Sequence, residues 1–349
     1  MSIRKIAKLA GLSPAAVSFA LHDSPKISKK TRLRVRELAQ RLGYKPGAKI
    51  TELMAQIRAR RGPQSEGCFG VISLYDTPNP WEKSEHLSSI YNSARRRAQE
   101  LGYRLESLWL RAPGMTYRRF RSVLDARGIQ GLLCFGSQNL NDHFPDELDH
   151  YAVVTVGLSV HTPLHRVTSH FYSDMTYALN RLYHLGYRRP GLILGHYEDQ
   201  RSAHAYSSAY LGWGEHMLVA KNEVPVLRLD RIEDPPLAHW LNTYKPDVIV
   251  LVHLHGALEE LASALRRQKI KVPEQIGVAA ISHDLKNTGF SGMQQNQALM
   301  GAWAVELLVS RVMNEDFGIP THPRIEMVES EWIEGDSLRR VYPAGEEPK

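Results

Sequence analysis

Nine side chains of this sequence could together bind a small molecule. They are polar or aromatic residues that follow short apolar runs typical of buried strands, namely Tyr75, Asp76, Trp81, Trp109, Ser137, Arg201, His253, Asp284 and Gln295. Tryptophan and tyrosine rings stack on sugar rings, while carboxylate, guanidinium and amide groups make directional hydrogen bonds to hydroxyl groups. For each aromatic residue, packing in a core is an equally good interpretation. The set predicts a ligand site if the fold brings these loops together.

The same sequence contains no recognised catalytic or metal-binding pattern. His253 and His255 stand two positions apart at an expected strand end, where their imidazoles point to opposite faces. No third ligand follows them at a recognisable spacing. There is no G-x-S-x-G, H-E-x-x-H, P-loop or G-x-G-x-x-G motif, and the pair Glu259 and Glu260 is expected on an exposed helix face. We therefore predict no catalytic residue, no metal and no cofactor, and a protein that is not an enzyme.

Alternating apolar and amphipathic segments must position the candidate residues. Strands are expected at 67–75, 103–109, 130–136, 152–157, 191–195, 224–229, 247–253 and 276–281. Helices are expected at 84–101, 116–127, 173–185, 203–219, 235–243, 256–268 and 298–315. Strands separated by helices predict right-handed βαβ units, and this many strands divides into two α/β lobes with parallel sheets. Ligands of such folds bind beyond the carboxyl ends of the strands.

Length and composition limit the class of protein. The chain has 349 residues, which suggests two or three domains, and its 43% apolar and 23% charged residues are ordinary for a globular protein. No apolar run approaches the length needed to cross a bilayer, and no apolar signal core follows the charged N-terminus. Cys68 and Cys134 form neither a metal pair nor a disulfide framework, and we expect buried free thiols. We expect a cytoplasmic protein without a membrane partner.

Positive charge is concentrated at the N-terminus. Residues 1–61 contain 15 Lys and Arg but only three acidic residues, a net charge of +12, whereas the remaining residues carry a net charge of −5. A basic head on a slightly acidic body is typical of a nucleic-acid-binding module attached to another domain. A merely soluble basic tail is the alternative, but apolar residues recur in this head at helical spacing.

Three short helices are expected in the basic head. The first covers 3–10 and ends at Gly11, which can adopt the left-handed conformation. Ser13 can cap a second helix of about two turns that begins at Pro14, and Ser28 can cap a third. The residues expected to face inward are Ile3, Ile6, Ala7, Ala10, Val17, Ala20 or Leu21, Leu33 or Val35, Leu38 and Leu42.

Two short helices joined by a tight turn form a helix-turn-helix. Its second helix is short because only its first turns enter the major groove of DNA. Basic side chains around it would contact phosphates without sequence preference. These are Arg4, Lys5, Lys8, Lys26, Lys29, Lys30 and Arg32. The alternative is a small three-helix packing or protein-docking unit.

Two segments of the head carry a family pattern: "IAKLAGLSPAAVSFAL" and "ISKKTRLRVRELAQRLGYKP". The positions that match it are Ile6, Ala7, Ala10, Gly11, Ser13, Val17, Ser18, Leu21, Ile27, Ser28, Thr31, Arg32, Val35, Leu42, Gly43, Tyr44 and Pro46. With these matches the segment resembles the DNA-binding head of the LacI family of bacterial transcription regulators.

The resemblance implies which residues meet DNA. Pro14, Ala15 and Phe19 occupy the base-reading positions of the family. Because Ala15 and Phe19 cannot hydrogen-bond a base edge, polar readout falls to His22 and Lys26. The remaining candidates, at capping and phosphate-contacting positions, are Ser13, Ser18, Ser28 and Thr31.

Residues 46–62 join the head to the body. Ile50, Leu53, Met54 and Ile57 fall on one stripe of a short helix. In the family this hinge helix forms when two copies meet on the operator, and a leucine from each copy is wedged into the minor groove. Leu53 matches that position. A plain amphipathic linker is the alternative.

The rest of the chain resembles the body of the same family, which is similar to type I periplasmic sugar-binding proteins. The segments "RGIQGLLCFGS", "VVTVG", "LYHLGYRRPGLILG" and "VPEQIGVAAIS" stand in the family's order. The resemblance implies two α/β lobes around an effector, with crossovers near 157–162, 285–296 and 317–325. The implied domains are a helix-turn-helix domain at 1–45, a hinge at 46–62, an effector-binding domain at 63–342 and a tail at 343–349. Within the body, lobe 1 is expected at about 66–158 and 296–318, and lobe 2 at about 159–290 and 322–340.

Two of the family's usual effector ligands are absent. Ala209 replaces the arginine of the "R-x-x-G-[FW]" motif, and Ser282 replaces the aspartate of the "G-[YF]-D" motif. Arg201 and Asp284 are candidate substitutes, and Gln295 matches a position that the family uses at the effector or the crossover. The expected effector is a carbohydrate or a derivative of one.

These observations predict a transcription regulator, specifically a repressor, whose affinity for DNA is controlled by a small molecule. We expect it to bind a pseudo-palindromic double-stranded operator as a homodimer, with contacts on helices 84–101 and 256–268. No heptad tail follows Trp332, which favours a dimer over a tetramer. The alternative is a sugar-binding protein or a carbohydrate-processing α/β enzyme with a basic appendage. A third interpretation is non-specific, architectural DNA binding.

Overall fold

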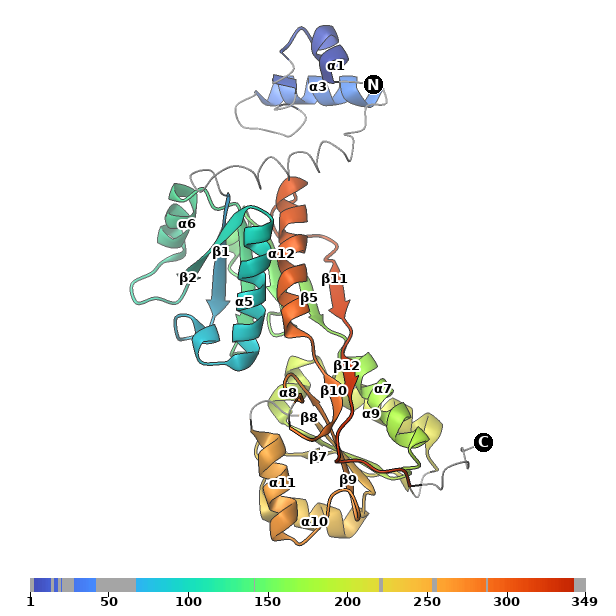
Figure 1. Ribbon diagram of the computed structural model, residues 1–349. Helices are drawn as coiled ribbons and strands as arrows, with labels where there is room; N and C mark the ends of the chain where they lie inside the picture. The colour runs from blue at the N-terminus through green and yellow to red at the C-terminus, as the bar shows by residue number, and fades with distance from the viewer. Residues whose placement is uncertain are drawn as a thin grey trace.

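The structure is a computed structural model that describes residues 3–13, 16–17, 20, 28–41, 67–140, 142–219, 222–252, 256–286 and 288–341. A small helical head at the N-terminal end is followed along the chain by two α/β lobes (Figure 1). The hinge helix expected within 46–62 and the tail at 343–349 lie outside the described residues.

The head packs its helices around a small apolar core. Helix α1 (Ile3–Ala10) and helix α3 (Lys29–Arg41) flank a segment in which residues 16–17 and 20 are also helical. The buried core residues are Ile6, Ala7, Val17, Ala20 and Val35. Val35 and not Leu33 faces inward on α3, because Leu33 is 53% exposed. The described part of the head therefore confirms α1 and α3 and the inward positions of Ile6, Ala7 and Val35, with Ala10 and Leu38 packed beside them.

Local hydrogen bonds fix the turns between the helices of the head. Gly11 follows α1 with φ of +66°, the left-handed conformation that glycine adopts without strain. Ser13 Oγ accepts the backbone N–H of Ala16 at 3.1 Å, and Ser28 Oγ accepts that of Thr31 at 3.3 Å. Both serines are therefore N-caps, as the sequence predicts.

The first lobe is built on a parallel sheet, with the strand order β11-β5-β4-β3-β1-β2. Its strands are β1 (Gly67–Leu74), β2 (Tyr103–Trp109), β3 (Gly131–Ser137), β4 (Ala152–Val156), β5 (His165–Ser169) and β11 (Ile325–Val328). The apolar core on one face lies under α5 (Glu85–Glu100) and α12 (Gln297–Met313). The core on the other face includes residues of α6 (Tyr117–Ala126) and the 3-10 turn η3 (Asp146–Leu148). Another 3-10 turn, η2 (Pro80–Glu82), precedes α5.

The two cysteines belong to the first lobe and are buried free thiols, as expected. Burial raises the pKa of the Cys134 thiol to about 11, so this sulfur stays protonated and unreactive at neutral pH.

The second lobe repeats this architecture. Its strand order is β12-β10-β9-β8-β6-β7, and β12 is antiparallel to β10 while the other pairs are parallel. The strands are β6 (Pro190–Leu194), β7 (Leu227–Arg228), β8 (Val248–Val252), β9 (Gly277–Ser282), β10 (Ser291–Gln294) and β12 (Glu331–Ile333). Helices α7 (Phe171–His184) and α9 (Ala205–Met217) contribute to one apolar core, and α10 (Asp234–Tyr244) and α11 (Ala257–Arg267) to the other. The short helix α8 (His196–Arg201) follows β6.

The described chain passes between the lobes three times, after β5, β10 and β11 (Figure 1). The second passage, at 295–296, falls within the expected range of 285–296. The first and third lie later in the chain than the expected 157–162 and 317–325, because β5 and β11 pair with each other and remain in the first lobe. Residues 159–169 and 325–328 therefore do not belong to lobe 2, where the sequence placed them. β5 carries polar residues at buried positions and β11 has exposed apolar ones, so neither has the apolar run of a buried strand.

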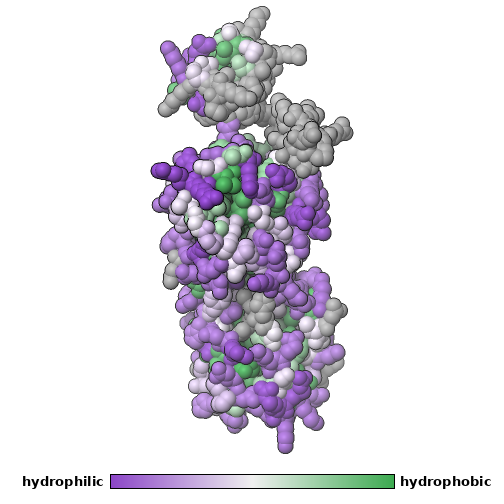
Figure 2. Space-filling model, turned by 90° about the vertical axis from the view of Figure 1, so that its left-hand side faces the viewer, coloured by the Kyte–Doolittle hydropathy of each residue, from purple (hydrophilic) through white to green (hydrophobic). Residues whose placement is uncertain are grey.

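The face of the molecule seen in Figure 2 is mostly hydrophilic over both lobes, with small hydrophobic areas between polar residues. Among the described helices, none is long and apolar enough to cross a membrane.

Candidate functional site

A cleft between the two lobes is lined by residues of both. It contains about 750 Å³ of space free of protein atoms, part of which is open to solvent. In the first lobe the lining comes from α5 and from the carboxyl ends of β3, β4 and β5, and in the second lobe from α8, the start of α9 and the ends of β8 and β9. This is the position that parallel α/β sheets give to ligand sites.

Three of the nine candidate ligand residues lie at this cleft. Arg201, the last residue of α8, and Gln295, in the second crossover, line it directly. Tyr75 follows β1 and, together with Arg201, lines the wider mouth that adjoins the cleft. Ser282, which replaces the family's usual aspartate, is also part of the lining.

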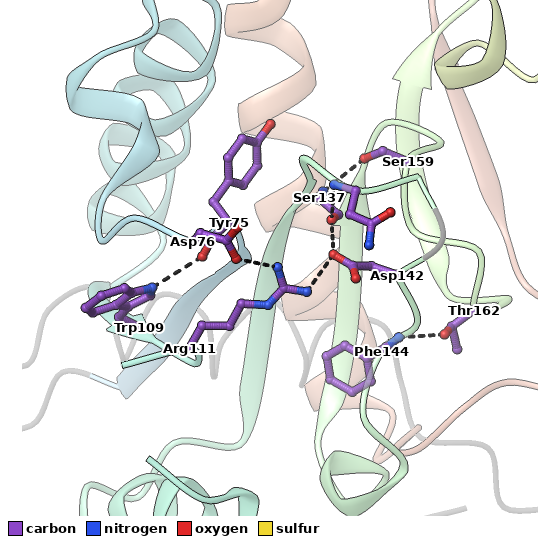
Figure 3. Close-up of polar contacts among 10 residues, drawn as sticks. Tyr75, Asp76, Trp109, Arg111, Ser137, Asp142, Phe144, Ser159 and Thr162 are labelled. Atoms are coloured by element: carbon purple, nitrogen blue, oxygen red, sulfur yellow. Dashed lines mark hydrogen bonds and ion pairs between the residues drawn. The ribbon is translucent and has the colours of Figure 1, made fainter. Parts of the chain in front are cut away.

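Two other candidates belong to a polar network beside the cleft (Figure 3). Arg111 donates to Asp76 at 2.9 Å and to Asp142 at 2.7 Å, and Asp142 also accepts a short hydrogen bond from Ser137. Asp76, Arg111 and Asp142 follow β1, β2 and β3 respectively, so the network joins three loops of the first lobe. Tyr75 points away from this network in the close-up.

The remaining four candidates lie elsewhere. Trp81 is 5% exposed and stacks on Tyr91 at 4.6 Å, in the apolar core of the first lobe. Trp109 donates from its indole N–H to the Tyr75 carbonyl at 3.3 Å and is not part of the cleft lining. Asp284 is exposed and lines a neighbouring pocket that shares Ile281 and Ser282 with the cleft. His253 lies outside the described residues.

A buried polar cluster lies at the crossovers. Gln295 donates to the Tyr206 hydroxyl at 2.8 Å. The carboxyl of Asp174, in the first turn of α7, is fully buried near Gln295 and Ser330, and burial raises the pKa of Asp174 to about 7. His170, in the first crossover, lies 2.7 Å from Glu329 in the third. Residues from all three crossovers thus contribute to one cluster.

Two tyrosines near Arg201 retain their protons. Burial raises the pKa of Tyr75, although the positive charge of Arg201 acts in the opposite direction. Burial, reinforced by the Asp174 carboxylate, raises the pKa of Tyr206 well above its usual value. Both phenols are therefore neutral hydrogen-bond donors at physiological pH.

Several lining residues were missed at the sequence level. His86, Phe171, Glu198 and Tyr206 all belong to the first turns of helices and not to the loops after strands. The sequence signal that could have found them is their position, since the first turn of a helix after a parallel strand points to the same edge of the sheet as the strand end. His86 also contacts the other lobe, because its ring centroid lies 5.5 Å from that of His283.

The DNA-contact candidates are only partly described. Ser13 and Ser28 are exposed, and their hydroxyls cap helices of the head. Thr31 is half-buried and hydrogen-bonds to Ser28 Oγ at 2.9 Å. The candidates outside the described residues are Pro14, Ala15, Ser18, Phe19, His22, Lys26 and Leu53. Over the described ranges, no group of three or more His, Cys, Asp or Glu side chains could hold a metal ion.

Comparisons with known proteins match both parts of the chain. The family described as "Bacterial regulatory proteins, lacI family" matches residues 2–47, and the "Periplasmic binding protein-like domain" matches residues 179–338. The repressor CytR of Escherichia coli is 24% identical over 338 residues, covering 91% of each chain. The repressor PurR of Haemophilus influenzae is 20% identical over 343 residues, covering 93% of this chain and 95% of that protein.

Solved structures show the same fold. The regulator CelR in complex with cellobiose is 21% identical with a TM-score of 0.57, and covers 97% of this chain and 99% of its own. The Lac repressor dimer bound to operator and an anti-inducer is 15% identical with a TM-score of 0.55, with the same coverage. The matched head, the matched body and their order along the chain agree with the helix-turn-helix and the two lobes described above. The chain therefore combines a head that matches the lacI family of bacterial regulatory proteins at residues 2–47 with a body that matches the periplasmic binding protein-like domain at residues 179–338.

Proposed function

We propose that this chain is a transcriptional repressor that binds operator DNA through its head and a small-molecule effector in the cleft between its lobes. The observation that carries the proposal is the basic three-helix head, capped at Ser13 and Ser28, on a two-lobed body. The alternative of a sugar-binding protein or carbohydrate-processing enzyme does not account for this head. In the proposed role the protein is not an enzyme, and it acts on chromosomal DNA in the cytoplasm.

In this function the second helix of the head enters the major groove. Pro14, Ala15 and Phe19 face the bases there, with His22 and Lys26 supplying polar readout. Ser13, Ser18, Ser28 and Thr31 contact phosphates, and Leu53 is wedged into the minor groove. Two copies bind the two halves of a pseudo-palindromic operator, so a homodimer is the active form.

The effector acts through the cleft because it touches both lobes. A ligand there has different contacts in the closed and the open arrangement, so its binding shifts the equilibrium between them. The chain enters the first lobe from the head at β1, so a change in lobe arrangement within a dimer alters the spacing of the two heads. Operator affinity thereby depends on the ligand.

The test is selection of operator sequences from random duplex DNA by the full chain. We expect enrichment of a pseudo-palindrome, tight binding to it, and loss of that binding when residues 1–61 are removed. If the chain binds the selected sequence no more tightly than random duplex DNA at physiological salt, the proposal of a sequence-specific repressor is refuted. A steep salt dependence without sequence preference would instead indicate architectural DNA binding.

A further inference from the structure

Three polar side chains of the cleft wall already make hydrogen bonds within the protein. Ser202 Oγ donates to the carbonyl of Asp199 at 3.0 Å. Ser169 Oγ donates to the thioether sulfur of Met300 at 3.4 Å. Gln295 is bonded to the Tyr206 hydroxyl at 2.8 Å. A sugar carries a hydroxyl on nearly every carbon, and each hydroxyl buried without a partner costs binding free energy. This wall therefore offers few partners to a polyhydroxylated ligand.

Most of the remaining wall is apolar and comes from both lobes. Leu87, Ile90 and Phe135 contribute from the first lobe, and Phe171 and Ile281 from the second. The ring of Phe171 packs on Tyr206 with its centroid at 5.2 Å, which leaves an aromatic surface at the cleft. A ligand that fills this space gains free energy by burying apolar area, so its body must itself be apolar.

Arg201 is the cation of this cleft. It lines both the cleft and its mouth, and among the described residues no hydrogen bond or ion pair engages its guanidinium. Tyr75 and Tyr206 lie near enough for its charge to act on their ionisation. The Tyr206 hydroxyl accepts its bond from Gln295, so its own proton is free to be donated. The guanidinium and the two neutral phenols can each donate a hydrogen bond to an anion.

Glu198 is the acidic residue of the lining. Its carboxylate lies against Gly195 at the start of α8, where a side-chain Cβ on that glycine would collide with it. A carboxylate at the first turn of a helix is favoured by the exposed N–H groups there. Glu198 stands one helical turn before Arg201 and lines the same cleft and mouth, but among the described residues no ion pair joins the two side chains.

From these contacts we infer that the effector is an amphipathic monocarboxylate, and not a sugar. Its carboxylate binds Arg201 and the hydroxyls of Tyr75 and Tyr206, and its aromatic or branched apolar body packs between Ile90, Phe135 and Phe171. A phosphate ester fits less well, because within the cleft lining its second negative charge would be buried beside Arg201 alone, and the second cation, Lys83, lines only the mouth. This inference rests on the proposed function, since it specifies the ligand of the same cleft.

The test compares matched probes on the full chain by thermal shift and titration calorimetry. The probes are 3-phenylpropionate, cyclohexanecarboxylate and 4-methylvalerate, the primary amide of each, cellobiose and glucose 6-phosphate. We expect the strongest stabilisation from a carboxylate and at least tenfold weaker binding of its amide. Arg201→Gln should weaken carboxylate binding by about 10- to 100-fold and leave amide binding unchanged. Arg231→Gln, which changes an exposed arginine outside the cleft lining, should leave both unchanged.

Three outcomes would overturn the inference. These are preferential binding of cellobiose or the sugar phosphate, carboxylate binding that survives Arg201→Gln, and absence of binding by every carboxylate probe. Operator binding by the same preparation is measured in parallel. If the operator is bound but the carboxylates are not, the proposed repressor function is retained and only the inferred class of ligand is wrong. If no operator is bound, the proposed function itself fails.

Discussion

The side chain of Arg111 joins three loops of the first lobe through two carboxylates of very different exposure. Asp142 is 12% exposed and accepts from both Arg111 and Ser137, whereas Asp76 is 80% exposed. Solvent screens an exposed ion pair, while a nearly buried carboxylate that is removed leaves its donors without a partner. The two ends of the same network should therefore differ in their contribution to stability.

We predict that Asp142→Ala lowers the free energy of unfolding by about 1–3 kcal/mol, because Arg111 and Ser137 lose a shared acceptor. Asp76→Ala is the matched control and should cost less than about 0.5 kcal/mol. Urea denaturation of the two variants measures the difference. Equal losses would mean that the network does not depend on the buried carboxylate.

Asp174 predicts a pH dependence of stability. Burial raises the pKa of this carboxyl to about 7 in the folded protein, above its ordinary value in the unfolded chain. The folded state therefore holds this proton more tightly, so the contribution of Asp174 to stability falls as pH rises from about 4 to about 7 and stays low above that. The other titratable groups nearby are His170, Glu329 and Tyr206.

We predict that Asp174→Asn removes this dependence. The free energy of unfolding of the unchanged protein should fall between pH 5 and pH 8 relative to that of the variant, by an amount of the order of kcal/mol. Denaturant titrations across this range compare the two proteins, and taking the difference cancels the other titrating groups. Parallel pH profiles would show that the carboxyl is ionised throughout.

The candidate ligand residues show what a sequence can and cannot predict at this scale. Arg201, Gln295 and Tyr75 lie at the cleft or its mouth because the ends of parallel strands share one edge of a sheet. Trp81 was selected for the same reason, but the turn η2 brings it back into the core against Tyr91. The direction of a side chain after a strand depends on the loop conformation and the packing, and neither leaves a periodic signal in the sequence.

Among the helices, α5 and α12 pack against each other at a glycine. A Cβ added at Gly301 of α12 would overlap the carbonyl oxygen of Ile90 in α5, so only glycine permits this approach of the two backbones. Gly212 in α9 differs, because a Cβ at that position would have no atom within 4 Å. The two glycines allow a comparison of packing with helix propensity.

We predict that Gly301→Ala lowers the free energy of unfolding by about 2 kcal/mol or more, since the helices must separate or shift. Gly212→Ala should instead raise it by about 0.5–1 kcal/mol, because alanine loses less backbone entropy in a helix. Thermal and urea unfolding report both changes. A stabilised Gly301→Ala variant would contradict the close contact between α5 and α12.

At the level of elements, the sequence predicts long and periodic segments best. All eight expected strands of the body occur, although β7 is reduced to Leu227–Arg228. The unexpected strands β5, β10, β11 and β12 lie beside the crossovers and are three to five residues long. Strands this short depend on their neighbours in the sheet, so their own sequence carries little information.

At the level of the whole molecule, charge and connectivity divide the protein into two functions. The net charge of +12 at residues 1–61 suits phosphate contact, whereas the body is slightly negative and encloses the cleft between its lobes. The division was predictable because composition changes along the chain and the head motif is local. The path of the crossovers was not predictable in detail, because strand order is fixed by pairing between distant segments.

This organisation makes a quantitative prediction about two sites on one chain. If ligand in the cleft changes operator affinity through the arrangement of the lobes, operator DNA must change ligand affinity by the same factor, because both binding free energies belong to one thermodynamic cycle. We expect a factor of about 5 to 150. Fluorescence anisotropy with labelled operator gives one ratio of dissociation constants, and calorimetry with ligand in the presence and absence of operator gives the other. Ligand binding that leaves operator affinity unchanged would separate the cleft from the control of DNA binding, even though both sites bind their partners.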